Sequence, residues 1–178
     1  MIFKATPLEG LWEIRPEINR DERGFFARTF GFDEFAARGL SAEWAYGGVS
    51  WNEKAFTLRG LHYQAAPHPE HKLVRCTQGA VFDVAVDLRP GSATYLHWHG
   101  LELTAENHAA LYIPPGLAHG FLSLTAGSEV YYQIKGLYKP ESARGLRWDD
   151  PALGIAWPGR PAVIAPRDAA WPGINGPG

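Results

Sequence analysis

Apolar and polar residues alternate with a period of two along most of the chain. Residues 81–88 show this best: Phe82, Val84, Val86 and Leu88 share one face of the predicted strand, and Val81, Asp83, Ala85 and Asp87 share the other. Similar segments, rich in β-branched and aromatic residues, are separated by glycine, proline, asparagine and aspartate. This pattern is typical of an antiparallel β-sandwich or barrel.

Two local signals refine this prediction. The turn-forming residues 89–92 predict that the next strand begins at Thr94 and continues to Trp98. Only residues 33–39 look helical, with Asp33 as the expected N-cap and Gly39 as the stop. The sequence therefore predicts an all-β chain with one short helix.

The C-terminal segment from Asp150 onward has a different composition. Prolines exclude long helices and strands there, and they stand at Pro151, Pro158, Pro161, Pro166, Pro172 and Pro177. The same segment carries Trp157 and Trp171, and large aromatic residues are rare in disordered segments. We expect this segment to pack as a tail over the barrel.

Composition limits the possible partners. We expect the 178 residues to form one domain, residues 1–178, that buries roughly 70% of its unfolded surface. A net charge of −2 provides no basic face for nucleic acid or an anionic membrane. The single cysteine, Cys76, excludes an intramolecular disulfide, and no segment resembles a signal peptide or a membrane span. These features predict a cytoplasmic protein.

The residues best suited to catalysis lie in two nearby segments and between them. They are His62 in residues 57–64 (Thr-Leu-Arg-Gly-Leu-His-Tyr-Gln), Lys72, and His119 in residues 113–121 (Ile-Pro-Pro-Gly-Leu-Ala-His-Gly-Phe). Two imidazoles and an ammonium that converge in one pocket can remove a proton beside a carbonyl and stabilise the charge on its oxygen. The pattern therefore indicates enolisation chemistry.

The strand predicted over residues 57–64 contains a geometric conflict. Alternation places Gly60, His62 and Gln64 on one face and turns Arg59 away from His62. Gly60 permits a bulge that would re-aim Arg59, so both arrangements remain open.

These segments belong to a longer ordered pattern. Its other pieces are Asp21-Glu22-Arg23-Gly24-Phe25-Phe26, residues 81–89, residues 102–107, Trp148-Asp149-Asp150-Pro151 and Arg167-Asp168. In this order, and over nearly the whole chain, the pattern resembles the nucleotide-sugar 3,5-epimerase family. The resemblance implies a double-sheet jelly roll, the cupin-type barrel, and a homodimer in which N-terminal strands reach across to the partner.

The resemblance also implies catalytic roles. His62 would be the base, and Asp168 the carboxylate that pairs with its imidazole and fixes the tautomer. Tyr132 would be the acid on the opposite face, since a phenol with a pKa of about 10 can return a proton to carbon. Lys72, together with His119, would stabilise the enolate oxygen.

A second group of residues is implied to bind the nucleotide. Arg59, and Arg23 from the neighbouring subunit, would hold the diphosphate, for which the guanidinium fork is well suited. Phe26 and Tyr138 match positions where aromatic residues of the family contact the nucleotide. The expected partner is a nucleotide-diphospho-sugar.

Three positions depart from the family pattern. Gly47 and Val49 replace two amides that usually precede the Arg-Gly-Leu-His segment, and Arg28 stands where an acidic residue is common. These departures leave the nucleotide base and the exact sugar open.

A metal site is the main competing interpretation. Metal-binding cupins combine a histidine- and carboxylate-bearing motif with a Pro-x-Gly-x-x-His motif, and residues 114–119 fit the second. In the first motif, however, Gln64 replaces an imidazole and Lys72 replaces a carboxylate, and an ammonium beside a divalent cation is unfavourable. We therefore expect no metal and no other cofactor.

His97 and His99 need separate consideration. Two histidines at i and i+2 on a strand can both ligate a metal, and Glu102 lies close behind them. We interpret this segment as an exposed strand face, because it lies outside the functional motifs of the family.

The leading hypothesis is a metal-independent epimerase. It would act at C3, C5 or both of a nucleotide-diphospho-4-keto-6-deoxyhexose, of the dTDP-4-keto-6-deoxyglucose type, by removing a proton beside the C4 ketone. One alternative is a metal-dependent cupin oxygenase or isomerase that uses His62, His119 and one of the histidines of residues 97–99. Another is a non-catalytic module that binds nucleotide sugars.

Overall fold

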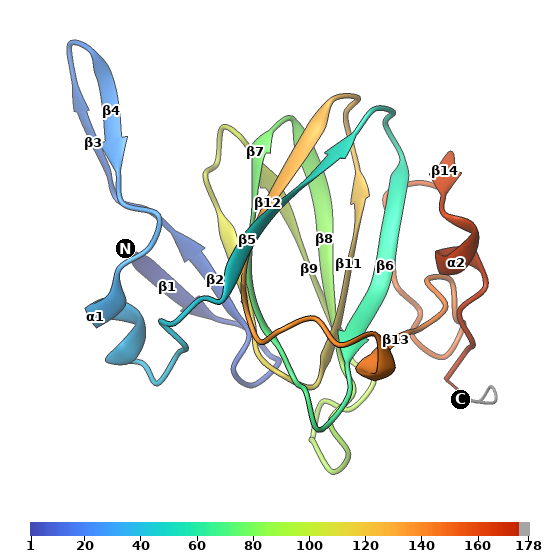
Figure 1. The fold of residues 1–178 in the computed structure, drawn as a ribbon. Helices are drawn as coiled ribbons and strands as arrows, with labels where there is room; N and C mark the ends of the chain where they lie inside the picture. Colours follow the sequence, from blue (N-terminus) through green and yellow to red (C-terminus); the bar gives the residue numbers. More distant parts are fainter. Residues whose placement is uncertain (175–178) are drawn as a thin grey trace.

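The computed structural model describes residues 1–174, and its main body consists of two antiparallel sheets that face each other (Figure 1). The first sheet has, in spatial order, β1 (Ile2–Ala5), β2 (Trp12–Arg15), β10 (Ala110–Ile113), β7 (His71–Gln78), β12 (Ser128–Lys135) and β5 (Tyr46–Asn52). The second has β13 (Ala143–Gly145), β6 (Thr57–Gln64), β11 (Leu117–Ser123), β8 (Ala80–Asp87) and β9 (Trp98–Thr104), with β14 (Val163–Ile164) beside β6. The predicted all-β jelly roll is confirmed.

Short elements lie outside the two sheets. The hairpin of β3 (Ile18–Asp21) and β4 (Gly24–Ala27) projects from the barrel, and nearly all of its residues are exposed (Figure 1). The helix α1 (Phe32–Ala36) follows it, a 3₁₀ turn spans Pro140–Ser142, and the helix α2 (Pro166–Ala169) lies near the C-terminus. No helix within residues 1–174 is long and apolar enough to cross a bilayer.

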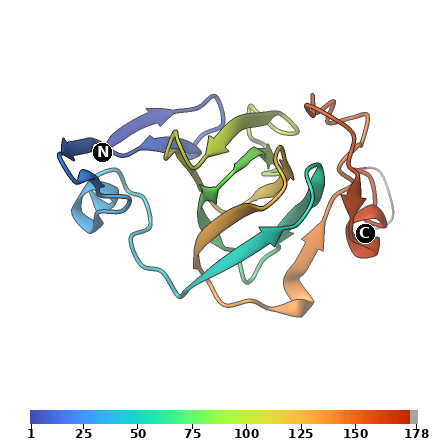
Figure 2. The ribbon, with the colours of Figure 1, turned by 90° about the horizontal axis from the view of Figure 1, so that it is seen from above.

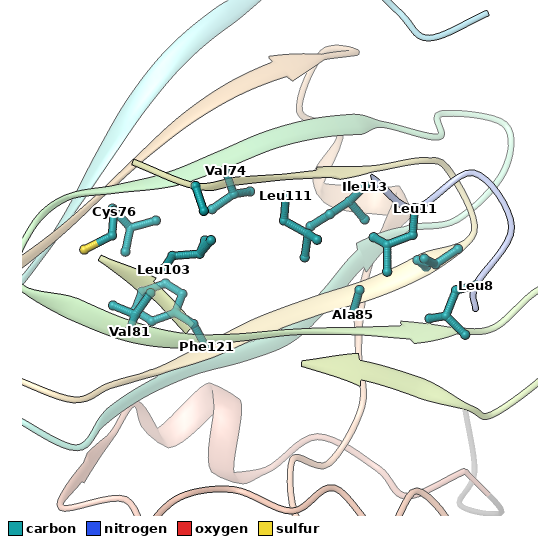
Figure 3. Close-up of a cluster of buried hydrophobic side chains, with 13 residues drawn as sticks. Leu8, Leu11, Val74, Cys76, Val81, Ala85, Leu103, Leu111, Ile113 and Phe121 are labelled. Atoms are coloured by element: carbon teal, nitrogen blue, oxygen red, sulfur yellow. The ribbon is translucent and has the colours of Figure 1, made fainter. Parts of the chain in front are cut away.

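The main core lies between the two sheets. Val74 and Leu111 from the first sheet face Val81, Ala85 and Phe121 from the second, and all five are almost fully buried (Figure 3). The inward position of Val81 and Ala85 confirms the alternation predicted for residues 81–88. Burial of each of the larger side chains, the valines, Leu111 and Phe121, stabilises the fold by about 1.5–3 kcal/mol.

The outer face of the second sheet is apolar as well. Val84 and Val86 point away from the barrel core and pack, with Phe82, under the C-terminal segment. There the Trp157 ring lies 6.1 Å from the Phe82 ring, and its indole N–H donates to the Trp148 carbonyl at 3.0 Å. The predicted packed tail is confirmed, and Figure 2 shows it along one side of the barrel.

The helix predicted over residues 33–39 is present but differs at its start. It spans Phe32–Ala36, its N-cap is Gly31, and no side chain caps it, so the assignment of Asp33 as N-cap was wrong. Asp33 instead lies in the first turn, where a negative charge favours the helix N-terminus. The helix also ends earlier than predicted, at Ala36, and Gly39, with φ +67°, lies in the turn that follows.

The strand predicted from Thr94 was wrong, since β9 begins at Trp98. Residues 92–96 form a turn that is held by the buried Asp87 carboxylate. This carboxylate accepts hydrogen bonds from the hydroxyls of Ser92 and Thr94, both at 2.7 Å, and from the Arg89 guanidinium. In residues 92–96, side-chain hydrogen bonds to the Asp87 carboxylate therefore take the place of backbone hydrogen bonds between strands.

The prediction of one short helix missed α2. Its first residue is Pro166, which is tolerated because the first helical N–H has no partner within the helix. The prolines of the tail exclude long helices, but they permit this single turn.

We predict that Trp157→Ala destabilises the protein by about 2–4 kcal/mol, because it exposes the apolar outer face of β8. Urea unfolding measures this loss. Tyr95→Ala is the control, since Tyr95 is 46% exposed in a turn and its removal should change stability by less than about 0.5 kcal/mol. Equal effects of the two substitutions would contradict the account of the tail.

Candidate active site

A bulge in β6 determines which side chains enter the site. His62 pairs with His119 of β11, but Arg59 pairs with Phe121, so Gly60 and Leu61 together oppose Gly120. The extra residue reverses the alternation, and the side chains of Arg59 and His62 line the same cavity. The conflict left open by the sequence is therefore resolved in favour of the bulge.

Gly60 makes this bulge possible. Its φ is +124°, and a Cβ atom placed on it would lie 2.6 Å from the Gly120 Cα and 2.9 Å from the His119 carbonyl oxygen. Only glycine at this position allows the two strands to approach so closely. The Gly60 N–H donates instead to Asp168 Oδ2 at 3.1 Å.

Asp168 joins this bulge to His62. Its other oxygen, Oδ1, lies 2.7 Å from His62 Nε2. Burial alone would raise the pKa of the Asp168 carboxyl, but the hydrogen bonds from His62 and Gly60 outweigh it and lower that pKa below its ordinary value. An ionised Asp168 accepts the Nε2 proton, which leaves Nδ1 as the basic nitrogen of the neutral ring.

A second imidazole–carboxylate pair lies deeper. His119 Nε2 is 3.0 Å from both oxygens of Asp83, whose side chain is fully buried. The His119 ring also meets the Tyr132 ring edge to face, at 6.3 Å. Burial raises the pKa of the Tyr132 phenol, so this group keeps its proton over the physiological pH range.

Two connected chambers meet at the His62–Asp168 pair and Lys72. The inner chamber, about 260 Å³, is lined by Ser50, Arg59, His62, Lys72, His119, Phe121, Tyr132, Ile134 and Asp168. The outer chamber, about 280 Å³, is lined by Tyr46, His62, Tyr63, Gln64, Glu70, Lys72, Ile134, Tyr138, Ala143, Arg144, Arg167 and Asp168. Seven of the nine predicted site residues line these two chambers: His62, Asp168, Tyr132, Lys72, Arg59, His119 and Tyr138.

The other two predicted residues lie elsewhere in the chain. Arg23 and Phe26 are on the projecting β3–β4 hairpin (Figure 1), where Arg23 pairs with Asp21 and Phe26 is 70% exposed. Neither lines the two chambers of its own chain. Arg23 and Phe26 therefore do not join the other seven predicted residues within one chain.

The comparisons with known proteins agree with this geometry. The family model described as dTDP-4-dehydrorhamnose 3,5-epimerase matches residues 5–175. The chain belongs to this family. A relative from Sinorhizobium fredii, named dTDP-4-dehydrorhamnose 3,5-epimerase, is 41% identical over 98% of this chain and 90% of its own.

Solved structures of family members show the same fold. The epimerase from Elizabethkingia anophelis superposes with a TM-score of 0.94 at 35% identity, covering 98% of this chain and 96% of its own. The epimerase from Legionella pneumophila, solved in complex with dTDP-4-keto-L-rhamnose, has a TM-score of 0.91 at 38% identity, covering 98% and 93%.

Several residues at the site were missed by the sequence analysis. Glu70 pairs with Lys72, and Asp83 pairs with His119. Arg167 precedes Asp168, and its guanidinium lies 4.9 Å from the centre of the Trp171 ring. Asp83 carried a usable signal, because it is an aspartate between Val81 and Ala85 on the inward face of the strand.

Trp171 holds the tail against the catalytic strand. Its ring lies 6.3 Å from the His62 ring, edge to face, and it packs directly on Gly145, which pairs with His62 across β13 and β6. Any side chain at residue 145 would collide with the indole. The tryptophan predicted to pack with the tail thus also supports the proposed base.

The donors at this site do not fit the metal centre of metal-binding cupins. The amide of Gln64 donates to the carbonyls of His68 and Leu137 and accepts from the Lys139 N–H, so it is fully occupied. Lys72 is an ammonium that lines the outer chamber together with Gln64. In the described part of the chain, no group of three or more histidine, cysteine, aspartate or glutamate side chains is placed to hold a metal.

The interpretation of residues 97–99 as an exposed strand face is only partly correct. His97 is exposed, but it lies in the turn before β9. His99 is half-buried, and its Nε2 lies 3.0 Å from Glu13 Oε1, in an ion-pair position away from the two chambers.

We predict that Gly60→Ala destabilises the protein by more than about 2 kcal/mol and abolishes epimerase activity, because the added methyl group separates β6 from β11. Gly91→Ala is the control: Gly91 also has a positive φ, +82°, but a Cβ placed on it would have no neighbouring atom within 4 Å. Urea unfolding midpoints of the two variants measure the difference. A Gly60→Ala protein as stable and active as the control would refute the close approach.

Proposed function

We propose that this chain epimerises a nucleotide-diphospho-4-keto-6-deoxyhexose, with dTDP-4-keto-6-deoxyglucose as the substrate to test first. The observation that carries the proposal is the convergence of a His62–Asp168 pair, an ammonium and a protonated phenol on one cavity. These groups supply a base, an oxyanion partner and an acid. The family relationship supports this class of substrate.

The first step is proton removal by His62. The C–H bond beside the C4 ketone breaks, its proton moves to Nδ1, and its electron pair forms the C=C bond of an enolate. Asp168 balances the resulting imidazolium charge and keeps the ring oriented. General base catalysis of this kind contributes about 10²–10⁴-fold to the rate.

The negative charge then rests on the C4 oxygen. Lys72 is the cation at the junction of the chambers, and its side chain is only 12% exposed, so its charge is weakly screened by water. His119, backed by the buried Asp83 carboxylate, provides a second donor on the same cavity.

Tyr132 completes the inversion. It lies on β12 of the first sheet, whereas His62 lies on β6 of the second, so the two groups reach the cavity from opposite walls. The phenol donates its proton to the carbanion carbon on the face opposite His62. Because burial raises the pKa of Tyr132, the phenolate formed is a strong base that regains a proton readily.

Arg59 and the arginines of the outer chamber, Arg144 and Arg167, would bind the diphosphate, with Tyr138 beside the nucleoside. The Arg59 guanidinium is oriented by the Asn52 side-chain oxygen at 2.9 Å and by the Trp51 carbonyl at 2.8 Å. These two bonds orient the guanidinium where it lines the inner chamber.

We predict that the purified enzyme, incubated with dTDP-4-keto-6-deoxyglucose in D₂O, incorporates deuterium next to the ketone and inverts C3, C5 or both. NMR of the sugar identifies the position. His62→Ala should lower the rate about 10²–10⁴-fold with little change in nucleotide affinity, because the diphosphate contacts lie elsewhere.

The same assay in EDTA distinguishes the metal-dependent alternative. We expect an unchanged rate, since the residues of the chain supply every group used above. Activity that is lost in EDTA and restored by one divalent ion would refute the mechanism. Nucleotide binding without any exchange would support the non-catalytic module.

We predict that Tyr132→Phe separates proton removal from proton return. His62 still forms the enolate, but the proton comes back mainly from His62 with the original configuration. In D₂O the recovered substrate therefore gains deuterium while little inverted product accumulates. Normal inversion in this variant would remove Tyr132 from the mechanism, and equal loss of exchange and inversion would make it a positioning residue.

We also propose that the active unit is a homodimer in which the β3–β4 hairpin completes the partner's site. The exposed Arg23 and Phe26 on this hairpin support the proposal. If it holds, Arg23→Ala and His62→Ala proteins are each nearly inactive, yet activity reappears when they are mixed and allowed to exchange subunits. In such a heterodimer, the intact His62 of one subunit and the intact Arg23 of the other meet in one of the two sites.

Persistent inactivity after subunit exchange would contradict this arrangement, provided that mass spectrometry detects the heterodimer. A monomeric protein with full activity would contradict it as well.

A further inference from the structure

Lys72 has a partner that the mechanism above does not use. The Glu70 carboxylate oxygen Oε1 lies 3.0 Å from the Lys72 ammonium, and each side chain is only 12% exposed. Both line the outer chamber together with His62 and Asp168. A carboxylate this close to a proposed oxyanion partner must affect how that partner acts.

The backbone at Glu70 packs closely against the end of β12. Gly136, at the end of β12, has φ +109°, and a Cβ there would lie 3.0 Å from the Pro69 carbonyl oxygen and 3.5 Å from the Glu70 Cβ. Gln64 ties the preceding loop to the segment after β12 through its bonds to His68, Leu137 and Lys139. Glu70 immediately precedes β7, and its carboxylate reaches the Lys72 ammonium on that strand.

The charges around Lys72 make this partner consequential. Arg59 lies in the inner chamber, Arg144 and Arg167 lie in the outer one, and Asp168 is already occupied by His62 and Gly60. Among the residues that line the chambers, Glu70 is the carboxylate that pairs with the Lys72 ammonium. This ion pair therefore determines where the ammonium lies between the two chambers.

We propose that Glu70 is a positioning residue for the epimerisation: its carboxylate holds the Lys72 ammonium at the junction of the two chambers. The ammonium then meets the C4 oxygen while His62 removes the proton. Glu70 itself need not touch the reacting atoms. This inference rests on the proposed function.

One consequence distinguishes positioning from a general structural role. The enolate oxygen carries its charge only near the transition state, so a misplaced ammonium lowers kcat more than it changes KM.

The test compares Glu70→Gln and Glu70→Asp with wild type in the dTDP-4-keto-6-deoxyglucose assay. Glu70→Gln keeps the size of the side chain and removes its charge, and we expect kcat to fall about 10–100-fold with KM changed less than about threefold. Glu70→Asp keeps the charge but shortens the side chain, so we expect a kcat between those of Glu70→Gln and wild type. Glu106→Gln, an exposed turn carboxylate, is the control and should match wild type.

Each result decides one claim. A wild-type kcat in Glu70→Gln would overturn the inference while leaving the proposed function intact. A rise in KM without a fall in kcat would also overturn it, because Glu70 would then bind the substrate directly. Inactive wild-type enzyme would instead overturn the proposed function, and a lower urea midpoint in Glu70→Gln with unchanged kcat would assign the pair to stability alone.

Discussion

The candidate site depends on the two hydrogen bonds of one buried carboxylate. Asp168 binds the Gly60 N–H and the His62 imidazole, so it joins the β6 bulge, the proposed base and the C-terminal segment at one point. The bulge exists because Gly60 and Gly120 let two backbones approach more closely than any side chain would allow. It also turns Arg59 toward the same cavity as His62, so one backbone irregularity orients both residues.

The C-terminal tail places Asp168 beside His62 and also covers the outer face of the second sheet. The second sheet is apolar on both faces, and the tail covers the outer one through Trp157 while Trp171 packs beside His62. Removing the tail would therefore expose Val84 and Val86 and leave the imidazole without its carboxylate. The same packing that covers the outer face therefore helps to place Asp168 beside His62.

The sequence predicted the architecture well because period-two alternation is a local signal, as residues 81–88 show. It placed seven site residues around the two connected chambers through resemblance to a family, and the comparisons confirm that family. It failed where distant contacts decide the outcome. The turn at residues 92–96 follows from side-chain bonds to Asp87, and the partnership of Glu70 with Lys72 depends on how the loop packs against Gly136. Neither has a signature in the local pattern.

The central claim is that Asp168 fixes the tautomer of His62 so that Nδ1 is the base. Nitrogen-15 NMR of the histidine side chains tests it most directly, with His62→Gln used to assign the His62 signals. The account predicts a protonated Nε2 and an unprotonated Nδ1 at neutral pH in wild type, and loss of this preference in Asp168→Asn. A ring protonated at Nδ1 in wild type, or an unchanged preference in Asp168→Asn, would contradict it.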